Sequence, residues 1–82
     1  MLSEQVKKEI IKIIEFITDK ELIDVSGNLF DIGINSLEYV RLIVGLEEKF
    51  GIEFTYDFYE NYENQNIDDI VTYILGRIDG NV

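Results

Sequence analysis

The sequence predicts an all-α domain, a bundle of three longer helices and one short helix with a long loop between the first two. Three segments carry apolar residues at helical spacing, and residue types that favour helix ends flank them. With 82 residues, the chain has room for one small hydrophobic core. We therefore expect residues 1–82 to form a single domain.

The first expected helix covers residues 3–17, with Ser3 as its candidate N-cap. Its core stripe has the spacing of one helix face and consists of Val6, Ile10, Ile13, Ile14 and Ile17. Residues 18–35 form a long connection with a turn expected at residues 26–28. The connection should pack on the bundle because it contains the apolar residues Leu22, Ile23, Val25, Leu29 and Phe30.

A second helix is expected from Ser36 to Phe50. Gly33 interrupts the preceding segment, and both Asn35 and Ser36 are common N-cap residues. Gly51 is well suited to end the helix. At about 100° per residue, one side of this helix is a contiguous core stripe of Tyr39, Leu42, Ile43, Leu46 and Phe50.

The other side of this helix has an unusual pattern. Leu37 and Val44 fall there beside Arg41 and Glu48, so two aliphatic side chains are expected to be exposed, which is not rare in itself. Glu47 and Glu48 lie in the last turn, where the helix dipole disfavours a carboxylate by roughly a few tenths of a kcal/mol. These acids fit either a docking surface or a solvated face, and the pattern leaves both interpretations open.

In the C-terminal third of the chain, the residue pattern predicts a short helix at residues 57–61 and then a long final helix. Phe54 and Phe58 are expected to pack in the core. Asn66 is the candidate N-cap of the final helix, whose first turn carries Asp68 and Asp69. Its buried stripe consists of Ile67, Ile70, Val71, Ile74 and Ile78. Residues 80–82 are expected to fray.

Composition excludes several classes of function. The chain has no cysteine and no histidine, which excludes disulfides and cysteine-based zinc sites and removes the usual general base. Calcium-loop and phosphate-loop motifs are also missing. We therefore expect no catalytic residue and no metal ligand, and a hydrolase using Ser36 would lack a group to activate its hydroxyl.

The net charge is −10, from 17 acidic and 7 basic residues. Such a protein should be repelled by nucleic acid and by anionic membranes, and it should be steered toward basic partner surfaces. The N-terminus lacks the apolar centre of a signal peptide, and no apolar run reaches membrane-spanning length. We expect a soluble, cytoplasmic monomer.

Ser36 is the strongest candidate for a functional residue. At a helix start, its hydroxyl would lie beside unpaired backbone N–H groups and the positive end of the helix dipole, which together favour a phosphate on that oxygen. The alternative is that Asn35 or Ser36 only caps the helix, a contribution of about 0.5–2 kcal/mol.

Residues 31–54 resemble the second helix of acyl carrier proteins and the related peptidyl carrier domains. The family signature is an acidic residue, a glycine and then Asp-Ser-Leu, and this chain has Asp31-Ile-Gly-Ile-Asn-Ser36-Leu37 followed by the helical run to Phe50 and Gly51-Ile-Glu-Phe54. The resemblance implies a four-helix bundle of the acyl-carrier type, with 4′-phosphopantetheine from coenzyme A attached to Ser36 and an acyl or aminoacyl thioester on its thiol.

The same resemblance implies partners and a docking surface. The partners would be a phosphopantetheinyl transferase and an acyl- or aminoacyl-activating ligase or synthase with a basic docking surface, in fatty acid, polyketide or nonribosomal peptide synthesis. The docking residues would be Asp31, Asn35, Leu37, Arg41, Val44, Glu47 and Glu48.

Two residues depart from the family pattern. Asn35 stands where an aspartate is usual, and Arg41 stands at a position that is commonly acidic in fatty-acid carriers. The Leu29-Phe30 pair before Asp31 resembles the peptidyl carrier pattern. A different class of function also fits the sequence: an acidic helical interaction module that binds a basic partner without any prosthetic group.

Overall fold

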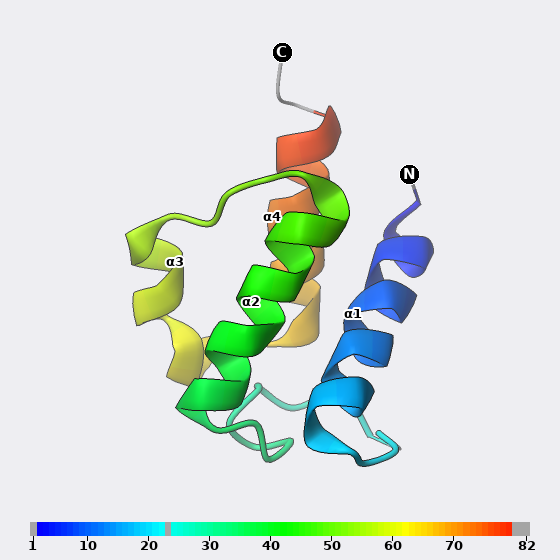
Figure 1. Cartoon of the computed structure of the whole chain (residues 1–82), viewed down its shortest axis with the longest axis vertical. Coiled ribbons are helices and arrows are strands. Elements are labelled where there is room, and N and C mark those ends of the chain that lie inside the picture. Colours follow the sequence, from blue (N-terminus) through cyan, green and yellow to red (C-terminus); the bar gives the residue numbers. More distant parts are fainter. Residues whose placement is uncertain (1, 23, 80–82) are drawn as a thin grey trace.

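Three long helices and one short helix make up the part of the chain that the computed structural model describes, residues 2–22 and 24–79. The elements are α1 (Ser3–Thr18), α2 (Ser36–Phe50), α3 (Tyr56–Glu60), the 3₁₀ turn η1 (Tyr62–Asn64) and α4 (Ile67–Asp79). Figure 1 shows α1 and α2 antiparallel, α4 behind them, and α3 on the side of α2 away from α1. The predicted all-α bundle is confirmed.

No helix within the described ranges combines the length and apolar character needed to cross a membrane.

The core lies where the apolar stripes of the long helices meet. Helix α1 packs against both α2 and α4, so it joins the bundle into one body. The predicted stripes are confirmed, with Ile13, Ile17, Phe50 and Ile78 only partly buried at their edges. The buried core consists of Val6, Ile10, Ile14, Leu29, Ile34, Tyr39, Leu42, Ile43, Leu46, Phe54, Ile67, Ile70, Val71 and Ile74.

The end of α2 and the start of α4 match their predicted caps. Gly51 adopts φ +65 and its N–H donates to the Glu47 carbonyl at 2.9 Å, which closes the last turn of α2. At the start of α4, the Asn66 side chain accepts from the Asp69 N–H at 2.8 Å, and the Asp69 carboxylate accepts from the Asn66 N–H at 3.0 Å. These side chains thus satisfy helix-end backbone groups as expected from the sequence.

Three local predictions are wrong. Leu2, not Ser3, is the N-cap of α1, and the N–H of Leu2 donates to the Gln5 side chain at 3.0 Å. Helix α3 begins and ends one residue earlier than predicted. The turn predicted at residues 26–28 lies instead at residues 29–33. Ile23 and residues 80–82, which carried predictions of packing and fraying, lie outside the described residues.

The long connection packs on the bundle through Leu22, Val25 and Leu29, as predicted, but the prediction is wrong for Phe30, which is 61% exposed. Leu29 is completely buried, and its N–H donates to the carbonyl of Gln65 at 2.8 Å. Asn28 and Asn66 form an isolated antiparallel bridge. The connection is therefore attached to the segment that leads into α4, and Figure 1 shows it crossing the end of the bundle where α2 begins.

The orientation of α2 can be tested by matched truncations. Leu46 is fully buried whereas Leu37 is 62% exposed and Val44 is 43% exposed. Leu46→Ala should lower the free energy of unfolding by about 2–5 kcal/mol, and Leu37→Ala or Val44→Ala by less than about 1 kcal/mol. Urea denaturation measures these differences. A Val44→Ala cost as large as that of Leu46→Ala would show that the rotation of α2 is wrong.

Candidate functional site

A compact turn precedes α2 and sets where the helix begins. The Asn28 side chain accepts from the Asp31 N–H at 2.9 Å, and the Ile34 N–H donates to the Leu29 carbonyl at 3.1 Å. Gly33 lies in this turn with φ +95, a conformation that favours glycine. Asp31, a predicted docking residue, is exposed on the turn.

Ile34 fixes the turn to the bundle. Its side chain is 2% exposed, and its carbonyl accepts a hydrogen bond from the Tyr62 hydroxyl. Burial raises the pKa of Tyr62, and the nearby carboxylates of Glu63 and Glu38 raise it further, so the phenol stays protonated and can donate. The backbone is thus held from two sides only two residues before Ser36.

Asn35 is the N-cap of α2. Its side chain accepts from the Glu38 N–H at 2.8 Å, and the Glu38 carboxylate accepts from the Asn35 N–H at 3.0 Å, which completes a capping box. Between the two candidates for the cap, the structure therefore selects Asn35. The Glu38 carboxylate therefore already has a hydrogen-bond partner, the N–H of Asn35.

Ser36 is the first residue inside α2, and its side chain is exposed. Within the described ranges, its hydroxyl makes no hydrogen bond, and neither the Ser36 N–H nor the Leu37 N–H has a partner. A hydroxyl with no structural task thus lies beside two free amides at the positive end of a helix. This arrangement suits a phosphate ester on the serine oxygen.

The face of α2 beside Ser36 is apolar and exposed. Leu37 and Val44 lie on it, as predicted, and Val40 joins them with 44% of its surface exposed. Val40 was not predicted from the sequence, although its position between Val44 and Ser36 on the helical wheel could have indicated it. Arg41 is exposed beside this group, and among the described residues no carboxylate lies within 4 Å of it. We call Leu37, Val40, Arg41, Val44 and Glu48 the α2 face.

Glu47 has a different environment from Glu48. Its side chain is half-buried, and its carboxylate accepts from the Phe54 N–H at 2.9 Å. This bond holds the segment after α2 against the helix. Glu48 is exposed. The sequence grouped the two acids, but the structure gives Glu47 a structural contact that accounts for an acid near the C-terminus of the helix.

Comparison with known proteins identifies the family. Residues 4–74 match the family described as "Phosphopantetheine attachment site". The chain belongs to this family of acyl and peptidyl carrier proteins. It is 38% identical over 71 residues to an acyl carrier protein of Campylobacter hominis, an alignment that covers 87% of this chain and 86% of that protein. No solved structure matches the chain.

Membership fixes the cofactor of this carrier. It is 4′-phosphopantetheine, held covalently. The family is non-catalytic and works with phosphopantetheinyl transferases and acyl-handling enzymes. The exposed, unpartnered hydroxyl of Ser36 is a suitable acceptor for such a group.

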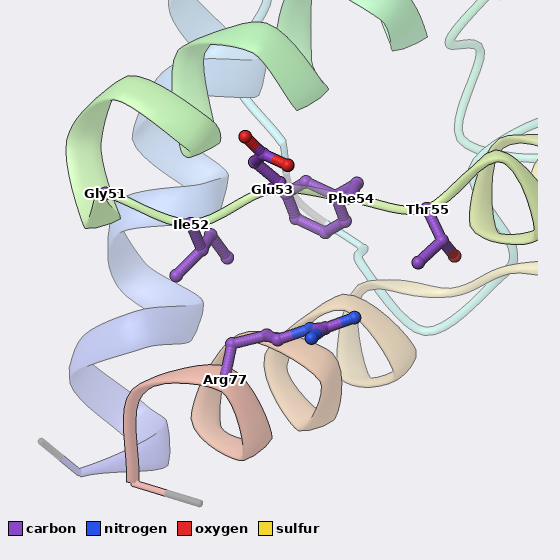
Figure 2. A pocket seen from close by; sticks show the side chains of 6 residues that line it. All are labelled: Gly51, Ile52, Glu53, Phe54, Thr55 and Arg77. Atoms are coloured by element: carbon purple, nitrogen blue, oxygen red, sulfur yellow. The ribbon is translucent and has the colours of Figure 1, made fainter. Parts of the chain in front are cut away.

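An open hollow of about 560 Å³ lies at the other end of α2, between residues 51–55 and α4. Figure 2 shows Arg77 extended along α4 beneath this segment, with Glu53 pointing away from it. The guanidinium of Arg77 lies 5.0 Å from the centre of the Tyr73 ring and donates to the Tyr73 hydroxyl at 2.8 Å. Tyr73 in turn stacks on Phe54 at 4.8 Å. Arg77 therefore extends an aromatic stack in this carrier.

Asn35 caps α2 and Ser36 does not, so truncating these two side chains should change the free energy of unfolding by different amounts. Asn35→Ala should reduce the free energy of unfolding by about 0.5–2 kcal/mol because it removes the cap, and Asn35→Asp should retain most of the stability. Ser36→Ala should change it little, since the hydroxyl has no partner and alanine favours helix. Urea denaturation of the three variants provides the measurement. Equal losses for Asn35→Ala and Ser36→Ala would contradict this assignment of the cap.

Proposed function

We propose that this chain acts as a single carrier domain over residues 1–82 and holds acyl or aminoacyl groups as thioesters on a 4′-phosphopantetheine arm attached to Ser36. It delivers them to biosynthetic enzymes of the fatty acid, polyketide or nonribosomal peptide type. The observation that supports this proposal most is the exposed Ser36 hydroxyl at the start of α2, unused by the cap. We further propose that it works as a cytoplasmic monomer, where coenzyme A is available.

Attachment requires one displacement at phosphorus. The Ser36 oxygen forms a bond to the phosphorus of coenzyme A that carries the pantetheine, the pyrophosphate bond breaks, and adenosine 3′,5′-bisphosphate leaves. The serine proton passes to the transferase or to water. The free N–H groups of Ser36 and Leu37 then stabilise the charge of the phosphodiester. When bound, the arm supplies the thiol that forms the thioester.

The α2 face is the proposed docking surface for partner enzymes. Leu37, Val40 and Val44 supply an apolar centre, and Glu48 supplies an acid at its edge. Arg41 adds a cation, so we propose a partner surface that is mainly basic and has one acidic group opposite Arg41. Asp31, Asn35 and Glu47 complete the proposed docking set, although Asn35 and Glu47 also make the internal contacts described above.

Modification of Ser36 tests the proposal directly. Incubation with coenzyme A and a broad-specificity phosphopantetheinyl transferase should increase the intact mass by one phosphopantetheine unit. Ser36→Ala should abolish the increase, and Ser26→Ala is the matched control that should keep it. Wild-type protein that stays unmodified with several transferases would refute the carrier proposal and favour an acidic interaction module without a prosthetic group.

Docking on the α2 face predicts a specific set of rate changes. Leu37→Ala, Val40→Ala and Val44→Ala should each lower kcat/KM for modification by about fivefold or more, equivalent to about 1 kcal/mol. Glu48→Lys should lower it most at low salt and less as salt rises, whereas the aliphatic effects should persist.

The controls for docking use residues that separate binding from folding. Thr72→Ala, at an exposed position on α4, should leave kcat/KM unchanged. Glu47→Gln keeps an oxygen acceptor for the Phe54 N–H, so it removes charge without removing that bond. If the aliphatic variants are modified at the wild-type rate, the transferase does not dock on this face.

A further inference from the structure

One hydrogen bond reaches the turn before Ser36 from a distant part of the chain. The Tyr62 hydroxyl donates to the carbonyl of Ile34, a residue 28 positions earlier. Within the described ranges no backbone N–H donates to this carbonyl, so Tyr62 supplies its hydrogen bond. Figure 1 shows the segment after α3, which carries Tyr62, beside the start of α2. The bond therefore links η1 to the backbone that leads into α2.

The same segment holds the other end of the turn. The N–H of Leu29 donates to the carbonyl of Gln65 at 2.8 Å. The turn is thus attached at both ends to residues 62–65. Leu29 lies seven residues before Ser36, whereas Ile34 lies two residues before it. Of the two attachments, the bond from Tyr62 therefore acts more directly on the position of the serine.

The ring of Tyr62 is fixed by its neighbours. Its centre lies 4.8 Å from that of the Tyr39 ring in α2, at an interplanar angle of 45°. Tyr39 is 2% exposed, and its hydroxyl donates at 2.8 Å to the side chain of Gln65, which is 4% exposed. The Tyr62 backbone is held too, because its carbonyl accepts from the Gln65 N–H at 3.4 Å. The Tyr62 hydroxyl thus has a defined position.

Tyr59 belongs to the same aromatic cluster and provides a comparison. Its ring centre lies 6.0 Å from that of Tyr39, at an interplanar angle of 89°. Like Tyr62, it is half-buried. In the part of the chain that the structure describes, the Tyr59 hydroxyl makes no hydrogen bond. Only Tyr62 of this pair bonds to the turn, which makes Tyr59 a matched control.

The position of the serine oxygen matters for the transfer. The oxygen must approach phosphorus in line with the leaving group, and a misplacement of about 1 Å can cost about 100-fold in rate. The Ser36 hydroxyl has no hydrogen bond among the described residues, so the backbone sets its position. Asn35, extended with φ −82 and ψ 173, joins Ile34 directly to the first residue of α2. A fixed Ile34 carbonyl therefore limits where the serine oxygen can lie.

We propose that Tyr62 is a positioning residue for the modification of Ser36. Its hydroxyl holds the Ile34 carbonyl and thereby keeps the serine oxygen in the orientation from which it attacks phosphorus. Tyr62 touches no reacting atom and lies outside the α2 face, so the bond raises the rate of transfer without changing docking. The inference rests on the proposed attachment at Ser36 and adds a residue to that site.

Single-turnover kinetics with the transferase in excess separate transfer from docking. Tyr62→Phe should lower the maximal rate constant by about tenfold, since Leu29 and the buried Ile34 side chain still limit the displacement of the turn. The transferase concentration that gives half the maximal rate should stay within about twofold of the wild-type value. Tyr59→Phe should leave both quantities unchanged. Circular dichroism checks that both variants are folded.

Two further measurements connect the rate to the hydrogen bond. In Tyr62→Phe, the amides of Ile34 and Asn35 should exchange faster, and the carbonyl chemical shift of Ile34 should move toward that of an unbonded carbonyl. Incorporation of para-aminophenylalanine at position 62 retains an N–H donor and should restore most of the rate. A role limited to packing would not depend on a donor.

Several outcomes would overturn the inference. These are equal rate constants for wild type and Tyr62→Phe, equal losses in Tyr62→Phe and Tyr59→Phe, or a change only in the half-maximal concentration. In each case the carrier is still modified, so attachment stands, whereas wild-type protein that no transferase modifies would refute attachment itself. If Tyr62→Phe does not fold, the wild-type carbonyl shift of Ile34 decides, because an unbonded value there overturns the inference.

Discussion

Gln65 is the point at which the segments around the site meet. Its backbone carbonyl accepts from Leu29 in the long connection, and its side chain bonds to Tyr39 of α2 and to the backbone of α3. It lies two residues before α4 begins. A short helix of five residues has little stability of its own, so these bonds and the aromatic contacts hold α3 in place. The position of the turn that presents Ser36 depends on the same residue through Leu29.

The presentation of Ser36 depends on a division of tasks between neighbours. Asn35 and Glu38 satisfy the backbone groups that would otherwise compete for a side-chain oxygen, and Ile34 holds the preceding backbone in the core. The serine hydroxyl can then be modified at little structural cost. An aspartate at position 35 could accept the same hydrogen bond, so the asparagine removes a charge from this end of the helix and keeps the cap.

The sequence predicts the features that depend on local pattern. The stripes of the long helices, the C-cap at Gly51 and the exposure of Leu37 and Val44 follow from a period of 3.6 residues and from cap chemistry. Gln65 could not be predicted to be buried, because its partner Tyr39 is 26 residues away and polar residues are usually exposed. The contact of Glu47 with the Phe54 N–H likewise depends on how the chain turns after α2. Hydrogen bonds between residues far apart in the chain produce no periodic pattern in the sequence from which they could be predicted.

The net charge is distributed unevenly, and this affects how a partner would approach. Residues 1–20 carry four acidic and four basic side chains, whereas residues 21–82 carry thirteen and three, so the whole charge of −10 comes from the second segment. Lysines of α1 and α2 are used in ion pairs at 3.1 Å, Lys7 with Asp68 and Lys49 with Glu9. Helix α1 is therefore neutral, while residues 21–82, the segment that includes α2, are strongly acidic as a whole. Helix α2 itself carries three acidic and two basic side chains. A basic partner would be steered toward residues 21–82 at long range, and the aliphatic side chains beside Ser36 would then decide whether the encounter becomes a complex.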